Sequence, residues 1–333
     1  MNAVPDGPNI LIIKPGSLGD IIHALPSASW IKKQWPQAHL HWIVDTRWKP
    51  LLIGQPHIDH LVDFPRTRFR GVGAAFRFFS WLKSLETLRP DLTIDLQGLL
   101  RSGLMARAAK SKQIIGGDDA REGAGHFYHK SARIAPKAHG VERYRSILQT
   151  AGIDTESTPP IFKLPESKLP VNFEPSPPFV LLHTLSRGKG KSLSPSASDF
   201  LKKALTPLRV VLVGQDSSRK EANKNDPDDL INRSTLTELL ALCRAAHFII
   251  SVDSGPAHLA AAVNPNTLAI HSWSDPRRVG PWEKSAFVWK NGHISRVAEL
   301  SKIKGNQLNC NSPLPTENDL TQIANFVKHK LPD

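Results

Sequence analysis

Residues 10–34 read ILIIKPGSLGDIIHALPSASWIKKQ, and this stretch decides the fold class. Its first four residues form an unbroken apolar run, which is typical of a strand buried on both faces of a parallel sheet. The turn PGSLGD follows, and a helix is predicted from about Ile21 to Gln34. Because a strand, a short turn and a helix in this order begin a βαβ unit, the stretch predicts an α/β fold.

The same alternation continues through most of the chain. We predict further strands at residues 40–44, 60–64, 92–96, 114–115, 179–183, 210–213, 248–252 and 267–270. Helical patterns occupy residues 73–88, a segment after residue 96, and residues 194–205, 236–246, 256–263 and 317–330. Apolar strands joined by helices predict doubly wound parallel sheets that are covered on both faces.

The proline-rich segment 159–178 interrupts this alternation and is the best candidate for a linker, since dense proline disfavours helix and sheet. A chain of 333 residues is long enough for about two domains. We therefore predict two Rossmann-like domains, at residues 1–165 and 175–333. The last helix can alternatively pack back on the first domain. Ligands are expected in a cleft between the domains, at the carboxyl ends of strands.

The composition narrows the class of protein. The formal net charge is +13, from 43 Lys and Arg against 30 Asp and Glu, which favours anionic partners such as nucleic acid, acidic lipid or phosphorylated substrates. Two cysteines are too few for a disulfide framework or a cysteine zinc cluster, and they fit a reducing compartment. We see neither a signal-peptide pattern nor an apolar run of membrane-span length. The expected location is the cytosol, where the protein can also contact a membrane surface.

The turn after the first strand places Asp20 at the start of the predicted helix. This turn lacks the GxGxxG pattern of dinucleotide-binding folds and the GK[ST] ending of nucleotide-triphosphate loops. Two roles stay open for Asp20 on the residues alone. It can be the helix N-cap, which Asp favours, or a general base that takes a proton from an acceptor hydroxyl.

Residues 249–258 read IISVDSGPAH and form a second candidate site, where a strand meets a helix. The strand is predicted to end at Asp253, and backbone N–H groups follow at Ser254, Gly255 and Ala257. These groups can bind an anion at the start of the helix, and His258 can face the same anion. A phosphate site and a plain capped helix are both compatible with this pattern.

Two basic loops are further candidate binding sites. Residues 183–191 read HTLSRGKGK, and their glycines, hydroxyls and cations can wrap a diphosphate or form a solvated loop. Residues 66–70 read RTRFR, with Arg77 further on, and can hold acceptor phosphates, lie on an acidic membrane or be solvated. No metal site is predicted, because His126 and His129 are three residues apart and no third ligand is evident.

At these residues the chain resembles the lipopolysaccharide heptosyltransferases, and most closely those that add the first heptose to the inner core. The motifs that carry the resemblance are LIIKPGSLGDIIHALPS (residues 11–27), DLQGLLRSGLMAR (95–107), DDAREG (118–123), AHGVERY (138–144) and SVDSGPAHLAAA (251–262). The resemblance implies a GT-B fold and an inverting, metal-independent transfer from ADP-heptose, with no further cofactor. It also implies a Kdo-modified lipid A as acceptor, at the cytoplasmic face of the inner membrane.

The resemblance also assigns roles to residues. It implies that Asp20 is the catalytic base and that Arg121 lies in the acceptor site, where we add Gly19, Arg66, Arg68 and Arg70 as candidates. For the donor it implies Thr184, Ser186, Arg187, Asp253, Ser254, Gly255 and His258. The family's diphosphate-binding lysine precedes a Trp-Pro pair, whereas this chain reads KGKSLSP at residues 189–195, so that lysine is Lys191 or Lys189.

Other functions remain as alternatives. A transferase of the same fold can use a different donor sugar, or a later position of the core or a surface glycan as acceptor. A dinucleotide-dependent oxidoreductase is disfavoured, because neither half contains GxGxxG. A nucleic-acid-binding protein is suggested by charge alone, without a recognisable module. We therefore expect an ADP-sugar, an anionic lipid-linked acceptor and the inner membrane as partners, and no nucleic acid.

Overall fold

The computed structural model describes residues 7–156, 163–188, 190–219, 226–303, 308 and 313–331. The chain divides into two compact units, Met1–Pro165 and Glu166–Asp333, which we describe one at a time. The described part of the predicted linker, residues 163–178, contains neither helix nor strand. Its residues 159–162 lie outside the described residues, as does Lys189.

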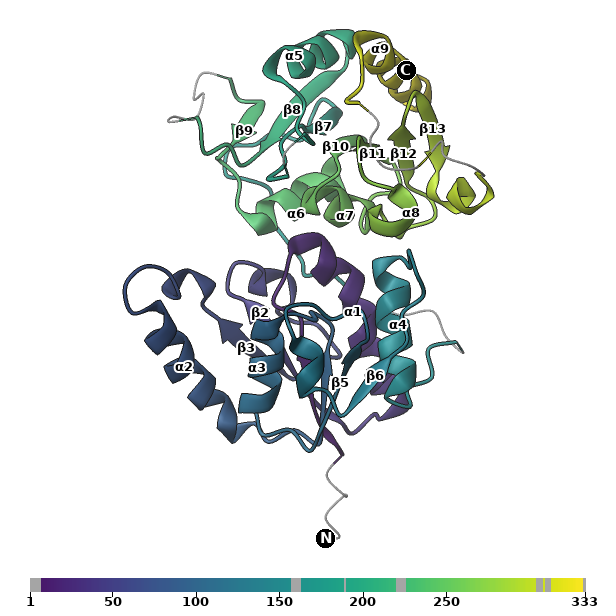
Figure 1. The fold of residues 1–333 in the computed structure, drawn as a ribbon. Coiled ribbons are helices and arrows are strands. Elements are labelled where there is room, and N and C mark those ends of the chain that lie inside the picture. Colours follow the sequence, from purple (N-terminus) through teal and green to yellow (C-terminus); the bar gives the residue numbers. More distant parts are fainter. Residues whose placement is uncertain are drawn as a thin grey trace. The chain divides into compact units, whose positions relative to one another are not determined.

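The described part of the first unit contains a parallel sheet with the strand order β3-β2-β1-β4-β5-β6. Its strands are β1 (Asn9–Ile13), β2 (His39–Asp45), β3 (His60–Phe64), β4 (Leu92–Asp95), β5 (Gln113–Gly117) and β6 (Lys130–Ala132). Its helices are α1 (Leu18–Gln34), α2 (Ala74–Ser84), α3 (Leu100–Ala108) and α4 (Gly140–Thr150). On one face Leu11 and Ile43 pack with Leu82 of α2 and Met105 of α3. Helices α1 and α4 pack against each other (Figure 1).

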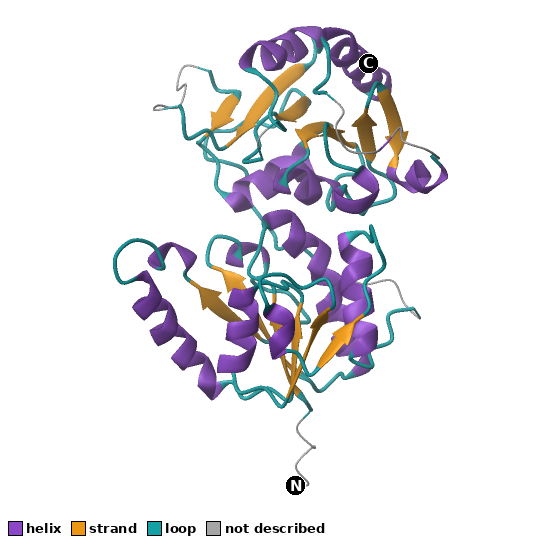
Figure 2. Ribbon diagram, viewed as in Figure 1, coloured by secondary structure: helices purple, strands orange, loops and turns teal. Residues whose placement is uncertain are grey.

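The described part of the second unit contains a sheet with the order β13-β12-β11-β10-β7-β8-β9, in which β13 is antiparallel to β12. Its strands are β7 (Phe179–His183), β8 (Arg209–Gly214), β9 (Asp229–Ile231), β10 (Phe248–Val252), β11 (Thr267–His271), β12 (Phe287–Lys290) and β13 (His293–Arg296). Its helices are α5 (Pro195–Ala204), α6 (Leu236–Ala245), α7 (Gly255–Ala261), α8 (Pro276–Val279) and α9 (Glu317–Lys330). Helices and strands are layered in both units (Figure 2).

Both sheets follow the same winding rule. In each unit the first strand lies between the second and the fourth, so the direction of winding reverses between β1 and β4 and between β7 and β10. This is the strand order of doubly wound nucleotide-binding folds, in which ligands bind beyond the carboxyl ends of the strands at the reversal. The predicted α/β class with two Rossmann-like sheets is thereby confirmed.

Several elements were not predicted, and each has a local cause. Helix α4 begins after His139, whose Nδ1 accepts a hydrogen bond from the N–H of Val141, and histidine is not among the usual capping residues. Strand β9 has only three residues. Strand β12 carries Lys290, which is 1% exposed, and its Nζ donates to the carbonyl of Ser272.

The last helix belongs to the core of the second unit. Leu320, Ile323 and Val327 of α9 join the apolar cluster that covers one face of the sheet, and α9 packs beside α5. The alternative placement of this helix on the N-terminal domain stays a prediction.

Candidate active site

Asp20 lies in the first turn of α1, at the reversal of the first sheet. Ser17 is the N-cap, so the expectation that Asp20 itself is the N-cap is wrong. Asp20 is instead the third helical residue of a capping box, and its Oδ2 accepts hydrogen bonds from the N–H and the hydroxyl of Ser17, each at 2.8 Å. Its side chain is 45% exposed. The capping box therefore fixes the direction of a carboxylate that solvent can still reach.

Lys14 is a buried cation beside this carboxylate. Its Nζ lies 3.8 Å from Oδ1 of Asp20, 3.4 Å from the carbonyl of Leu96 and 5.3 Å from the centre of the Tyr144 ring. Burial lowers the pKa of Lys14, but Tyr144 and Asp20 raise it by more, so the ammonium stays charged. Sequence reasoning quoted Lys14 only as part of the turn and missed this role. An isolated lysine at a strand end carries no signal that it will be buried.

The loop after β4 lies on the other side of the reversal. Asp95 is fully buried and accepts hydrogen bonds from the N–H groups of Gln97 and Gly98 and from the hydroxyls of Ser102 and Tyr128. Burial raises the pKa of Asp95 above its ordinary value. These contacts shape the loop, so Asp95 is structural.

Arg121 is attached to this loop through its backbone. Its N–H donates to the carbonyl of Gly98 at 2.9 Å, while its side chain is exposed. Gly19, a second acceptor candidate, is buried in the first turn of α1. The structure therefore brings both candidates to the strand reversal of the first unit.

The RTRF segment follows β3 and is folded around an aromatic anchor. Phe69 packs on Phe64, Phe78 and Trp81, with ring centres 5.4, 5.4 and 5.9 Å away. The side chains of Arg66, Arg68 and Arg70 are exposed. Phe69 is therefore part of the core, and the three arginines remain available for an anion.

Arg77 supports the same loop and does not present its guanidinium to a ligand. It donates hydrogen bonds of 2.7, 2.7 and 3.0 Å to the carbonyls of Arg68, Arg70 and Val72. The suggestion that Arg77 holds phosphate is replaced by this structural role.

Asp253 is the centre of a polar network at the strand reversal of the second unit. Its Oδ2 lies 2.6 Å from Nζ of Lys191, 2.5 Å from the hydroxyl of Ser274 and 3.7 Å from Nδ1 of His271. Lys191 also lies over the Trp273 ring, 4.6 Å from its centre. Sequence reasoning placed Lys191 and Asp253 in one site but missed His271 and Ser274, which lie on and after a strand that appeared purely apolar.

The charge state of this network follows from burial and contact. Burial raises the pKa of Asp253, but His271, Lys191 and Ser274 lower it by more, and the carboxylate is ionised. Burial lowers the pKa of His271 to about 4, so its ring is neutral at pH 7. At neutral pH the ammonium of Lys191 is therefore the charge partner of Asp253.

The loop after β7 folds onto Asp253. The Ser186 hydroxyl donates to the carbonyl of Asp253 at 3.5 Å and accepts from the N–H of Gly188 at 3.2 Å. The Ser192 hydroxyl accepts from the N–H of Ser186 at 2.8 Å. Thr184 is buried at the base of the loop and Arg187 is exposed at its tip. The structure therefore brings the described donor-loop candidates to the edge where β10 ends.

The remaining donor candidates follow β10. Helix α7 begins at Gly255, as the sequence predicted to within one residue, and His258 is buried in it. The Ser254 hydroxyl lies 3.0 Å from the carbonyl of Val252 and 3.4 Å from Nδ1 of His183, and it does not cap the helix.

Acid is expected to destabilise the second unit. Burial lowers the pKa of His183 to about 4, as it does for His271. Both histidines have an ordinary pKa of 6.5, so between pH 6.5 and 4 the unfolded chain binds protons that the folded chain does not. At pH 5 this removes about 2 kcal/mol of unfolding free energy per histidine relative to neutral pH.

Urea denaturation at pH 7.5 and pH 5.0 measures this effect. The urea midpoint of the wild type should fall at pH 5.0, and His183→Asn should weaken the pH dependence. The exposed His293 is the control, because His293→Asn should keep the wild-type pH dependence. Equal midpoints at the two pH values would contradict the assignment.

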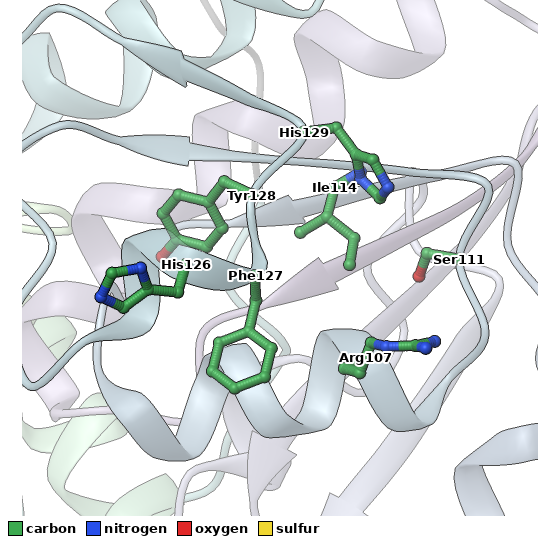
Figure 3. Close-up of a pocket in the computed structure, with 7 residues that line it drawn as sticks. All are labelled: Arg107, Ser111, Ile114, His126, Phe127, Tyr128 and His129. Atoms are coloured by element: carbon green, nitrogen blue, oxygen red, sulfur yellow. The ribbon is translucent and has the colours of Figure 1, made fainter.

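A pocket of about 520 Å³ lies elsewhere in the first unit (Figure 3). It is lined by Arg107, Ser111, Ile114, His126, Phe127, Tyr128 and His129, none of which was a predicted site residue. Nδ1 of His129 accepts a hydrogen bond from the N–H of Ile114, so this ring supports the backbone.

Among the described residues, no group of three or more His, Cys, Asp or Glu side chains could hold a metal ion.

The chain was compared with known proteins. A family model described as glycosyltransferase family 9 (heptosyltransferase) matches residues 78–308. Lipopolysaccharide heptosyltransferase 1 of Salmonella typhimurium is 25% identical over 298 residues, which cover 84% of this chain and 93% of that protein. The enzyme of the same name from Pseudomonas aeruginosa is 25% identical, with 83% and 82% covered. Lipopolysaccharide heptosyltransferase 3 of Escherichia coli is 24% identical, with 87% and 91% covered.

Solved structures share the fold. The E. coli heptosyltransferase WaaC with ADP has a TM-score of 0.72 at 20% identity, with 97% of this chain and 100% of that chain covered. The same enzyme with ADP-2-deoxy-2-fluoro heptose has a TM-score of 0.69 at 20% identity, with 96% and 99% covered.

No helix in the described ranges is both long and apolar enough to span a bilayer.

Proposed function

Because the chain belongs to glycosyltransferase family 9, the heptosyltransferases, we propose that it transfers heptose from ADP-heptose to the Kdo-lipid A inner core of lipopolysaccharide. Curated relatives named lipopolysaccharide heptosyltransferase 1 support the reaction, and the related structures with ADP and an ADP-heptose analogue support the donor. The observation that carries the proposal is the Asp20 carboxylate, which a capping box holds beside the buried Lys14.

The proposed mechanism is inverting and needs no metal ion. Asp20 takes the proton from an acceptor sugar hydroxyl, and the oxygen forms a bond to the anomeric carbon. The bond from that carbon to the diphosphate oxygen breaks on the opposite face, and ADP leaves with the electron pair. Fixed hydrogen-bond donors lower the barrier by stabilising the charge that develops on the diphosphate.

The second unit supplies these donors in our proposal. Lys191 is the cation that meets the diphosphate, together with the N–H groups of Ser254 and Gly255. Its Nζ lies 2.6 Å from Oδ2 of Asp253 and its side chain is 17% exposed, so it is within reach of solvent. Thr184, Ser186, Arg187, Asp253 and His258 complete the donor site in this proposal. Lys189 stays the alternative to Lys191.

The acceptor is bound by the first unit in our proposal. Kdo carries a carboxylate and lipid A carries phosphates, and the exposed Arg66, Arg68, Arg70 and Arg121 offer guanidinium groups suited to both, with Gly19 in the adjoining turn. We propose that the enzyme meets this acceptor at the cytoplasmic face of the inner membrane. We therefore keep that location as part of the proposal.

A donor and acceptor panel tests the function directly. The purified chain is incubated with ADP-heptose, UDP-glucose or UDP-galactose and with Kdo-lipid A, and products are identified by mass spectrometry. One added heptose is expected from ADP-heptose alone. Transfer from a UDP-hexose without transfer from ADP-heptose would overturn the donor assignment.

A later position of the core is the second candidate acceptor, since the heptosyltransferase 3 relative is nearly as similar as those of type 1. The same panel separates the two when it includes a core that already carries heptose. Heptose transfer to that core alone would assign the chain to the later step.

Lys191→Ala is expected to weaken ADP binding about tenfold, because a charge-assisted hydrogen bond to the diphosphate is lost. Isothermal titration calorimetry measures the affinity. Lys202→Ala is the matched control, since Lys202 also pairs with an aspartate in the second unit, at 3.3 Å from Asp226. An unchanged affinity in Lys191→Ala with a loss in Lys189→Ala would move the contact to Lys189.

A further inference from the structure

Large apolar side chains are exposed on α2 and on the turn before it. Val72 is 100% exposed, Phe76 is 78% exposed and Phe79 is 59% exposed. The spacing of three residues places Phe76 and Phe79 on the same side of α2, and Val72 directly precedes the residue that caps the helix. Exposed apolar side chains are normal singly, but a group of three within eight residues marks an interaction surface.

The opposite side of α2 holds the helix in place. Phe78, Trp81 and Leu82 pack in the core with Phe64 at the end of β3, which is the edge strand of the sheet (Figure 1). The Arg77 guanidinium also ties the preceding loop together through three carbonyls. Phe76 and Phe79 are exposed on the other side of α2, although the Phe79 ring also lies 6.0 Å from the ring of Phe78.

The charged residues in this segment of the chain are all positive. Residues 66–84 contain five cations, Arg66, Arg68, Arg70, Arg77 and Lys83, and no Asp or Glu. The nearest acidic residues along the chain are already paired, because Asp63 lies 2.7 Å from Lys49 and Glu86 lies 2.7 Å from Lys110. The segment thus presents exposed phenylalanines among cations, and it contains no acidic residue of its own.

We propose that Val72, Phe76, Phe79 and Lys83, with Arg68 and Arg70, form a docking face for the surface of an anionic lipid bilayer. Aromatic side chains enter the boundary between headgroups and acyl chains, and the surrounding cations bind the anionic headgroups. The bilayer as occupant rests on the proposed function, in which the acceptor is anchored in such a membrane. The docking face would then hold the first unit at the surface where its substrate lies.

The other occupants fit the docking face less well. A symmetric contact between two copies would oppose one group of cations to the same group of the partner, which costs electrostatic energy. Single-stranded nucleic acid stacks on aromatic rings beside cations, and the DNA-binding outcome of the test below distinguishes it from a bilayer.

Vesicle co-sedimentation of the full chain, without donor or acceptor, tests this proposal. Vesicles of phosphatidylglycerol with phosphatidylethanolamine are compared with vesicles of phosphatidylcholine. The wild type should bind the anionic vesicles and release them at high salt. The double variant Phe76→Ser/Phe79→Ser should bind at least about tenfold more weakly, and Lys83→Glu should weaken binding in the same direction.

Val171→Ser is the matched control, because Val171 is 86% exposed and lies in the second unit. It should bind vesicles like the wild type. The proposal is overturned if the double variant binds like the wild type, or if the wild type binds neither vesicle or both equally. It is also overturned if the double variant abolishes dimerisation or DNA binding of the wild type instead of vesicle binding.

A soluble acceptor without acyl chains separates this proposal from the proposed function. The double variant should transfer heptose to that acceptor at the wild-type rate, because neither phenylalanine belongs to the proposed catalytic or binding residues. Failure of the wild type to transfer heptose would contradict the proposed function and leave the vesicle result standing.

Discussion

Asp20→Asn lowers kcat about a thousandfold and leaves ADP affinity unchanged, if Asp20 is the general base. The amide keeps the size of the carboxylate but cannot take a proton from the acceptor hydroxyl. The donor contacts proposed here belong to the second unit, so the nucleotide should bind as before. Steady-state kinetics with ADP-heptose gives kcat, and calorimetry gives the ADP affinity.

Asp319→Asn is the control for the capping role of Asp20. Asp319 is the third residue of α9 and accepts hydrogen bonds from the N–H and hydroxyl of Thr316 at 2.8 and 2.7 Å, which is the same arrangement as at Asp20. Both variants weaken a capping box, at a cost of about 1 kcal/mol. Turnover should fall only in Asp20→Asn, and a kcat near that of the wild type would refute its role as base.

Asp253→Asn is expected to lower the unfolding free energy of the second unit by about 3 kcal/mol, because it leaves the Lys191 ammonium without its carboxylate. The amide retains the size of the side chain and can still accept from the hydroxyl of Ser274. We take the low end of the range for broken buried pairs, since Lys191 is 17% exposed. Urea denaturation followed by hydrogen exchange in β10 and β11 measures the loss.

Two further variants test the cause of this loss. In Asp253→Asn/Lys191→Met both charges are gone, so the loss should be smaller than the sum of the two single variants. The more exposed pair of Asp226 and Lys202 is the control, and Asp226→Asn should cost only about 0.5 kcal/mol. A purely additive double variant would show that the two charges do not stabilise each other.

Much of the fold could be predicted from apolar periodicity. Strands at 60–64, 179–183 and 248–252 and the helix at 317–330 were predicted with the bounds that the structure has. These elements are buried or amphipathic, so the spacing of their apolar residues follows the period of a strand or a helix. Strand β13, with a polar sequence and an antiparallel partner, and helix α4, with a histidine cap, carry no such signal.

The candidate site could be predicted only where the backbone dictates it. Asp20 and Asp253 follow strand ends, and the topology of parallel sheets places strand ends at the reversal of winding. The partners of these residues arrive from distant segments, such as Tyr144 beside Lys14 and Ser274 beside Asp253. Only the folded chain shows which loops meet, and so Lys14, His271 and Ser274 were missed.

Arg77 supports the backbone of residues 68–72. The side chains that fix this loop are therefore different from those that it exposes to a ligand. One guanidinium and the Phe69 ring fix the backbone, while Arg66, Arg68 and Arg70 extend outward from it. Exchanging any of these three would alter the charge pattern and leave the scaffold as it is. With the acceptor role that we propose for these arginines, acceptor preference can be changed one side chain at a time, without rebuilding the loop.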